Sequence, residues 1–237
     1  MKFVSTATIL SVIIPFKNEF HQLENSIDNF HIFQKENIEL IFVDDGSTDQ
    51  SAVLVENKYP GTTMIKLDGV GTGKAFSKGM EVAKGDFSFL LPVDCLILEN
   101  SLQKVLEKLH GESADVYVFP KQYGQKNGMR IYALLQNIFL LKFFHLAAWT
   151  NGFILKKEFY ELLERSSHEV FLVDLILSRS LRFKKWKVFE EKMIVSPRRY
   201  QKDGMIKRIT INGIIVFLWL IRVGNPKRLH KFYRRGK

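Results

Sequence analysis

The sequence contains one cysteine, Cys95, so an internal disulfide framework and a zinc site built from cysteines alone are both excluded. It also has no recognisable nucleic-acid-binding motif, internal repeat or low-complexity tract. The apolar N-terminal stretch has no convincing small-residue cleavage site, and we interpret it as a first strand rather than a signal peptide. These absences favour a globular protein that is cytosolic or faces the cytosol.

Acidic residues are scarce towards the C-terminus. Residues 193–237 contain twelve Lys and Arg residues and a single acid, Asp203. The formal net charge of the whole chain is +10, so the rest of the chain is close to neutral. A basic tail on a neutral body predicts a polyanionic partner, either an anionic membrane surface or a nucleic acid, and charge alone does not decide between them.

The order of apolar patterns predicts an α/β fold. With 237 residues, the chain suits one substantial domain with appendages. Short runs rich in β-branched residues alternate with stretches of helical spacing. The predicted strands are 9–15, 40–43, 64–67, 87–91 and 116–119, and the predicted helices are 19–33, 51–58, 73–83 and 101–109. This βαβαβ order predicts a doubly wound, mostly parallel open sheet that binds its ligand at the carboxyl ends of the strands.

Two later segments, 131–149 and 211–223, are apolar on almost all sides. The first is interrupted by polar residues, and the second is shorter than the roughly 20 residues that a membrane-spanning helix needs. Each is therefore predicted to be either a buried core helix or a helix lying in a membrane interface. The basic cluster that follows, 225–237, favours the interfacial alternative.

The first chemical motif is 41–49, Ile-Phe-Val-Asp-Asp-Gly-Ser-Thr-Asp. Asp44 and Asp45 end a predicted strand, where carboxylates are placed to accept hydrogen bonds from a base or a ribose. The alternative is that the motif only begins a helix, with Ser47 or Asp49 as its cap. That alternative accounts for Asp49 but poorly for the pair of aspartates.

The second motif is glycine-rich, 69–74, Gly-Val-Gly-Thr-Gly-Lys. Closely spaced glycines let backbone amides approach an anion, and Lys74 adds positive charge. The spacing departs from the Walker A loop and from G-x-G-x-x-G, so a nucleoside triphosphatase and a dinucleotide enzyme are both disfavoured. The alternative is a glycine-rich helix start that binds no ligand.

The third motif, 85–95, is a strand that brings Asp94 to the same edge of the sheet. A carboxylate there can hold a divalent cation against a diphosphate, since hard cations prefer oxygen ligands and share them with substrate phosphates.

Together these motifs resemble the inverting family 2 glycosyltransferases, which have the GT-A fold. The matching stretches are SVIIPFKNE (11–19), VDDGSTD (43–49) and GTGKAFSKGMEVAKGDFSFLLPVD (71–94). The region 126–160 looks most like that of the dolichyl- or polyprenyl-phosphate mannosyl- and glucosyltransferases, where an amphipathic stretch precedes a small-Gly-Phe element. In this sequence that element is Asn151-Gly152-Phe153.

The resemblance implies a nucleotide-binding half, about 9–95, and an acceptor half, about 96–208, within one GT-A domain. Residues 209–237 would form an apolar helix and a basic tail that associate peripherally with the cytoplasmic face of a membrane. The resemblance also implies a nucleoside-diphosphate sugar as donor, a lipid phosphate or a glycan as acceptor, Mg²⁺ or Mn²⁺ as cofactor, and no nucleic-acid partner.

The site residues follow from the same resemblance. Pro15, Phe16 and Glu19 would line the nucleotide pocket, Asp45 would reach the base or ribose, and Lys74 would lie near this edge. Asp94 matches the metal-binding acid, whereas Pro92 stands where the family has its first acid.

The acceptor side departs from the family in one position, Ala148, where the lipid-phosphate enzymes commonly have Asp. Asp174 is the candidate general base for a hydroxyl acceptor. A phosphate acceptor needs no base, and Arg198 and Arg199 would then hold its oxygens. The function expected is sugar transfer to a polyprenyl phosphate. The alternatives are a hydroxyl-accepting enzyme of cell-surface polysaccharide synthesis and a degenerate, non-catalytic member of the family.

Overall fold

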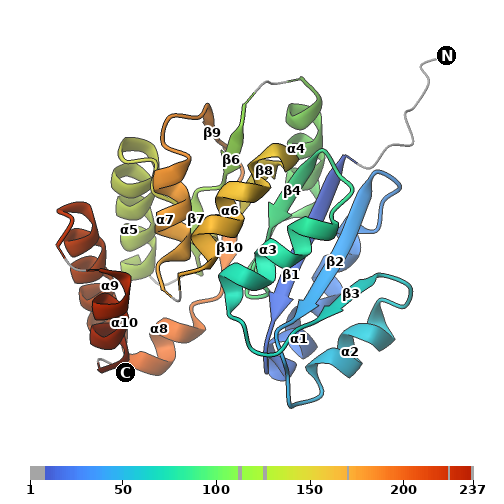
Figure 1. The fold of residues 1–237 in the computed structure, drawn as a ribbon, viewed down its shortest axis with the longest axis horizontal. Coiled ribbons are helices and arrows are strands. Elements are labelled where there is room, and N and C mark those ends of the chain that lie inside the picture. Colours follow the sequence, from blue (N-terminus) through green and yellow to red (C-terminus); the bar gives the residue numbers. More distant parts are fainter. Residues whose placement is uncertain (1–8, 112–113, 125–126, 170, 224, 236–237) are drawn as a thin grey trace.

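The computed structural model describes residues 9–111, 114–124, 127–169, 171–223 and 225–235. Its centre is a seven-stranded sheet in the order β3-β2-β1-β4-β8-β6-β9 (Figure 1). These strands are β1 (Leu10–Phe16), β2 (Ile38–Asp44), β3 (Thr63–Lys66), β4 (Phe87–Leu90), β6 (Val116–Val118), β8 (Phe153–Lys156) and β9 (Trp186–Val188). Only β8 runs antiparallel to its neighbours in this sheet. A smaller sheet joins β5 (Cys95–Leu96), β10 (Met193–Val195) and β7 (Lys121–Tyr123).

Helices cover both faces of the large sheet, which is why its central strands are apolar throughout. In β1, Val12 and Ile14 pack into one hydrophobic core, and Ile13 between them packs into the other. The first core is covered by α1 (Phe20–Ser26), the 3₁₀ helix η1 (Ile27–Phe33), α2 (Ser51–Lys58) and α4 (Glu99–Gly111). The second is covered by α3 (Thr72–Val82), α6 (Tyr160–Ser167) and α7 (Val173–Ser180). The short 3₁₀ helices η3 (Trp149–Asn151) and η4 (Lys157–Phe159) flank β8.

The predicted α/β order and the mostly parallel sheet are confirmed. Each of the five predicted strands and four predicted helices is present, with ends that differ by a few residues. The predicted helix 19–33 is divided, because α1 ends at Ser26 and continues as the tighter helix η1. Sequence patterns locate such elements well because their apolar period is local, whereas their ends depend on individual hydrogen bonds.

The remaining helices lie at the end of the molecule opposite β2 and β3 (Figure 1). They are α5 (Asn127–Leu135), the π-helix η2 (Gln136–Phe143), α8 (Arg198–Asp203), α9 (Met205–Leu220) and α10 (Pro226–Arg235). The predicted boundary after residue 208 falls inside α9, so the two predicted parts of the chain share one helix.

The two apolar segments are neither buried core helices nor membrane spans. In α5 and η2, Met129, Ala133 and Leu141 are buried, whereas Ile131 and Phe139 are exposed. Helix α9 is half-buried in the same manner. No helix of the described residues is long and apolar enough to cross a bilayer.

Candidate functional site

The site lies where the carboxyl ends of β1, β2 and β4 meet. The three strands are parallel, and their register sets Phe16 of β1 beside Asp44 of β2. The segments that leave these ends carry Glu19, Asp45 and Asp94, so residues far apart in the sequence converge on one edge, as the sequence predicts.

Asp44 and Asp45 are buried carboxylates that hold the neighbouring loops. Asp44 accepts a hydrogen bond from the Ser47 amide at 2.9 Å. Asp45 accepts from the amides of Val70 and Gly71 at 2.7 and 2.9 Å, so it fixes the glycine-rich loop onto the end of β2. Its role towards a base or ribose stays a prediction, and these contacts give it a structural role in addition.

The loops after β1 and β2 are joined by a second set of hydrogen bonds. The Asn18 side chain accepts from the Thr48 amide at 2.7 Å, and the Asn18 amide donates to the Ser47 hydroxyl at 3.0 Å. The Glu19 amide donates to the Ser51 hydroxyl at 3.0 Å. Pro15 and Phe16 are buried at the end of β1. The edge predicted to bind the nucleotide is therefore rigidly cross-linked.

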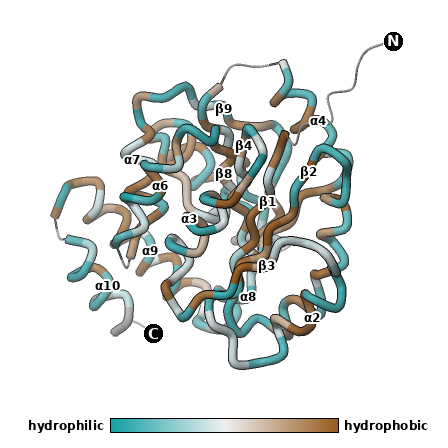
Figure 2. Tube along the Cα trace, turned by 45° about the vertical axis from the view of Figure 1, so that its right-hand side comes forward, coloured by the Kyte–Doolittle hydropathy of each residue, from teal (hydrophilic) through white to brown (hydrophobic). Residues whose placement is uncertain are grey.

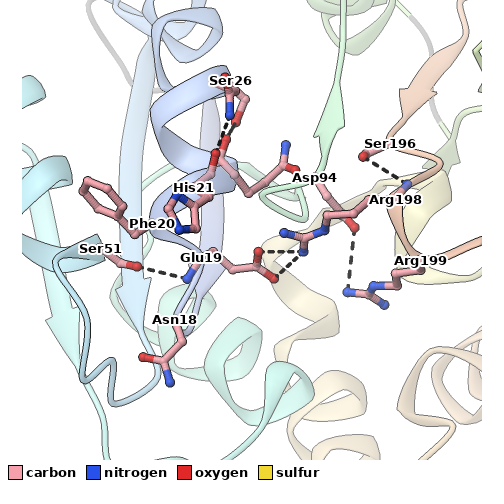
Figure 3. A network of polar contacts seen from close by, with 12 residues as sticks. Asn18, Glu19, Phe20, His21, Ser26, Ser51, Asp94, Ser196, Arg198 and Arg199 are labelled. Carbon is pink, nitrogen blue, oxygen red and sulfur yellow. Dashed lines mark hydrogen bonds and ion pairs between the residues drawn. The ribbon is translucent and has the colours of Figure 1, made fainter. Parts of the chain in front are cut away.

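Arg198 and Arg199 reach this edge from α8 and meet two of the predicted acids (Figure 3). The Nη2 atom of Arg198 donates to both carboxylate oxygens of Glu19, at 3.0 and 2.7 Å. The Nη2 atom of Arg199 lies 3.7 Å from Oδ2 of Asp94. Both arginines are thus paired with donor-edge carboxylates, and a phosphate group would compete with those acids for them.

Lys74 pairs with an acid of another helix rather than with Glu19 or Asp94. Its ammonium group donates to Glu164 of α6, which also accepts from Ser77. The hydrogen bond from Lys74 is the main cause that lowers the pKa of the Glu164 carboxyl. The pairing fastens the start of α3 to α6, and Lys74 lies outside the lining of the pocket next to the edge.

That pocket has a volume of about 370 Å³ and is walled by β7, η2, α7, α9 and the start of α3. Its charged lining residues are Asp94, Lys121, Asp174, Arg199 and Arg208. Of the predicted site residues, Asp94, Asp174 and Arg199 therefore share the pocket. The other predicted residues lie outside its lining; they are Pro15, Phe16, Glu19, Asp44, Asp45, Lys74 and Arg198.

Asp174 is the predicted base, and that role stays a prediction. It lies in the first turn of α7, where its carboxylate accepts from the amides of Trp149 at 3.2 Å and Leu175 at 3.0 Å. Burial nevertheless raises the pKa of the Asp174 carboxyl above its ordinary value. A carboxylate with a raised pKa is a stronger base than an exposed one.

Lys121 is the residue that the sequence interpretation missed. Only 6% of it is exposed, it lines the pocket, and its ammonium group has no hydrogen-bond or ion-pair partner among the described residues. Burial lowers the pKa of Lys121 to about 8, although nearby Asp174 favours the charged form. The available signal was a lysine two residues after the apolar run 116–119, just past the carboxyl end of a predicted strand.

The element Asn151-Gly152-Phe153 has a structural explanation. Gly152 has a φ of 55°, and a Cβ on it would lie 2.8 Å from Cε2 of the buried Phe89. The Asn151 side chain donates to the Phe119 carbonyl at 2.8 Å and accepts from the Ala148 amide at 3.0 Å. The element thus forms the turn into β8, and Asn151 lines the pocket.

The acids of the site can hold a metal ion only together with oxygen ligands from a bound substrate. Among the described residues, no group of three or more His, Cys, Asp or Glu side chains is placed to hold a metal ion. Asp94 is the one acid at the two positions where the family has its metal-binding acids, since Pro92 stands at the other. Mg²⁺ often binds through one or two carboxylates together with substrate phosphates. The residues present fit such a cation, with Asp94 as its ligand from the protein.

Comparison with known proteins gives a consistent picture. Residues 11–168 match the family model described as Glycosyl transferase family 2. The minor teichoic acid biosynthesis protein GgaA of Bacillus subtilis (strain 168) is 35% identical over 131 residues, which are 51% of this chain and 29% of GgaA. The chain spans less than half the length of the curated relatives it matches.

Two solved structures share the fold. TarS 1–349 of S. aureus superposes with a TM-score of 0.63 and 19% sequence identity, covering 86% of this chain and 66% of that structure. The mannosyltransferase PcManGT of Pyrobaculum calidifontis, solved in complex with GDP-Man and Mn²⁺, has a TM-score of 0.62 and 16% identity. That superposition covers 92% of this chain and 65% of PcManGT.

Proposed function

The chain belongs to glycosyl transferase family 2 and has the GT-A fold, and on that premise we propose that it transfers a sugar from a nucleoside-diphosphate sugar to a polyprenyl phosphate. The observation that carries the proposal is one pocket in which the acid Asp94 lies together with the cations Lys121 and Arg199. A diphosphate and a phosphate acceptor both need such cations, because each brings negative charge into the pocket.

The donor side rests on the edge formed by β1, β2 and β4. The loops held by the buried carboxylates of Asp44 and Asp45 would support the nucleoside, and the diphosphate would extend from there towards Asp94. UDP and UDP-GlcNAc are bound in solved structures of TarS, and GDP-Man in PcManGT, which supports a nucleotide sugar of unspecified base for this chain.

The proposed reaction is an in-line displacement at the anomeric carbon, with inversion. The acceptor oxygen forms the new glycosidic bond, and the nucleoside diphosphate leaves with the electron pair of the broken one. Asp94 would hold Mg²⁺ or Mn²⁺, which would neutralise charge on the leaving diphosphate. Arg199, released from Asp94 to the phosphate oxygens, would add stabilisation of the same kind.

For the acceptor, the charge of the pocket favours a phosphate. Lys121 supplies a buried cation without a partner among the described residues, and Arg199 is a second cation in the same pocket. A phosphate oxygen is already an anion, so its attack requires no general base. Lys121 would hold the acceptor or donor phosphate and exclude water from its side of the pocket.

A second candidate function is transfer to a hydroxyl group of a cell-surface glycan. Asp174 favours it, since a carboxylate with a raised pKa in the pocket wall is suited to remove the proton of an attacking hydroxyl. The similarity to GgaA, named for minor teichoic acid biosynthesis, also supports this candidate.

A direct assay separates these candidates. Purified protein is incubated with UDP- and GDP-sugars and with either a short-chain polyprenyl phosphate or a hydroxyl-bearing glycan, and products are identified by mass spectrometry. Product only with the lipid phosphate is expected. Product only with the hydroxyl acceptor establishes the second candidate. No product with either acceptor, together with no UDP or GDP binding by calorimetry, establishes a non-catalytic member.

A further inference from the structure

Two helical segments that are far apart in the sequence lie side by side and form part of the pocket wall. One is α5 with η2, residues 127–143, and the other is α9, residues 205–220. Leu140 of the first packs in one cluster with Val216 and Trp219 of the second. Both lie at the end of the molecule away from β2 and β3 (Figure 1).

Each of these segments has one face that lines the pocket and one that is exposed and apolar. Gln136, Leu140, Asn212 and Ile215 line the pocket. Most of the large hydrophobic side chains that the described residues expose lie on these segments or directly after them. We call this set the apolar face; it consists of Ile131, Leu134, Leu135, Ile138, Phe139, Phe143, Phe144, Met205, Ile206, Ile214, Phe217, Ile221 and Val223.

The exposure of the apolar face is high for residues of this type. Phe143 is 75% exposed, Ile206 is 77% exposed and Phe217 is 59% exposed. Single exposed hydrophobic residues are ordinary, but a concentration of them on two adjacent helices marks an interaction surface.

The charge around the apolar face is of one sign. Residues 127–144 and 205–235 contain no Asp or Glu. Exposed cations lie on the same segments and on α10, which is mostly hydrophilic (Figure 2). They are Arg130, Lys142, Lys207, Arg222, Lys227, Arg228 and Lys231. A second copy of this surface would repel it, whereas anionic lipid headgroups above an apolar layer complement both its charge and its apolar side chains.

Helix α10 is part of this end of the molecule rather than a free tail. Leu229 is buried, and His230 stacks on Phe171 with ring centroids 5.1 Å apart. Tyr233 lines the pocket. The basic side chains of α10 are therefore held next to α9.

We propose that the apolar face, with the basic residues of α10, is a docking surface for an anionic lipid bilayer. The helices lie along the membrane surface, since α9, with 16 residues, is about 24 Å long and too short to span a bilayer. Docking brings the pocket wall formed by η2 and α9 to the headgroup layer. An acceptor carried by a lipid then reaches the pocket without leaving the membrane, so the inference rests on the proposed function and deepens it.

Vesicle flotation tests the docking surface without any assay of activity. The vesicles contain phosphatidylcholine alone or with phosphatidylserine as the anionic lipid. Wild-type protein is expected to bind the anionic vesicles at low salt and to lose part of this binding, but not all, at high salt, because charge is screened and apolar burial is not. No binding to anionic vesicles at low salt would overturn the proposal.

Matched variants test the apolar face itself. Phe143→Asp combined with Phe217→Asp is expected to reduce the partition into anionic vesicles at least tenfold at every salt concentration. Phe183→Asp is the control, since Phe183 is 85% exposed and lies between α7 and β9, outside the apolar face. Equal losses in the control and the double variant contradict the proposal. Circular dichroism checks that each variant is folded.

A second pair of variants tests the charge. Lys227→Glu with Lys231→Glu is expected to weaken binding at low salt and to flatten its salt dependence. The control, Lys157→Glu with Lys185→Glu, makes the same change in net charge at exposed positions outside these segments. Point variants are preferable to removal of α10, because a truncation would also take Tyr233 from the pocket.

Two further measurements distinguish membrane docking from self-association and from catalysis. If sedimentation equilibrium finds a dimer that the Phe143 and Phe217 variants dissociate, the apolar face is a contact between copies and the docking surface is wrong. Transfer to a water-soluble acceptor, measured without vesicles, reports on the proposed function alone. If the wild-type protein shows transfer but does not bind anionic vesicles, only the docking surface is rejected. If it binds the vesicles but transfers no sugar, only the enzymatic proposal is rejected.

Discussion

The guanidinium of Arg199 lies 3.7 Å from the carboxylate of Asp94, at the point where the pocket meets the donor edge. Asp94 is 7% exposed, so Arg199 neutralises a carboxylate that has little contact with water. Substrate phosphates and a divalent cation would each attract one member of the pair, and the pair would open when both are bound.

Asp94→Asn is expected to lower the rate of sugar transfer at saturating donor by at least about 10², the scale for removal of one group that stabilises charge in a transition state. The variant keeps the size of the side chain and is expected to stay folded. Initial rates over a range of Mn²⁺ concentrations check this. Asp86→Asn is the control, because Asp86 is exposed at the opposite end of β4. If the Asp94 variant turns over at the wild-type rate at limiting Mn²⁺, Asp94 has no role in the reaction.

Asp174→Asn distinguishes the two acceptor classes. With a hydroxyl acceptor, loss of the base is expected to lower kcat/KM by about 10²–10⁴, and with a phosphate acceptor the rate is expected to change only a few-fold. The pH profile gives a second readout. Because burial raises the pKa of Asp174, hydroxyl transfer is expected to fall at a higher pH than an exposed aspartate would give, as acidification protonates the base. An unchanged acid limb in the variant contradicts the assignment.

Lys121 is expected to make folding stability depend on pH. Its pKa is about 8 in the folded protein and 10.5 ordinarily, so between these values the unfolded chain binds a proton that the folded protein has released. The free energy of unfolding therefore rises with pH across this window, by up to about 3 kcal/mol. Urea unfolding of wild type and Lys121→Met at several pH values across this window checks this, since the variant lacks the rise. Lys157→Met, at an exposed position, serves as the control, and parallel curves for wild type and Lys121→Met contradict the assignment.

Gly152→Ala is expected to destabilise the fold through the turn into β8. A Cβ there would lie 2.7 Å from Cε of Met193 and 2.8 Å from Cε2 of Phe89, and a φ of 55° disfavours a side chain in any case. Strain of this kind costs about 1–3 kcal/mol. Gly61→Ala is the matched control, because Gly61 has a φ of 81° but nothing within 4 Å of its Cβ position. Thermal unfolding is expected to give a larger loss at Gly152, and equal losses would mean that packing around it is irrelevant.

The sequence predicts the donor edge well, because each part of it is encoded locally. The run 40–43 is apolar and contains two β-branched residues, and Gly46 follows the aspartates, so a strand that ends in two carboxylates can be predicted without knowledge of the fold. Parallel order then follows from the alternation of strands and helices. Asp94 is predicted for the same reason.

The partners of these acids are not predictable in that way. Arg198 and Glu19 are separated by 179 residues, and the sequence contains many other arginines and acids. Lys74 is a reasonable phosphate ligand by its glycine-rich context, yet in the structure its ammonium group donates to Glu164 of α6. Ion pairs depend on distances between elements, which local patterns do not contain.

By itself, the sequence determined the order of the strands and helices, the edge at which the acids converge and the positive charge of the C-terminal region. Only the tertiary structure decided that Lys121 is a buried cation in the pocket, and that 131–149 and 211–223 each have one buried and one exposed side. The sequence of an apolar helix shows how much hydrophobic surface the helix carries, but not how much of that surface its neighbours cover. That quantity depends on the packing of η2 against α9, two segments that lie far apart in the chain.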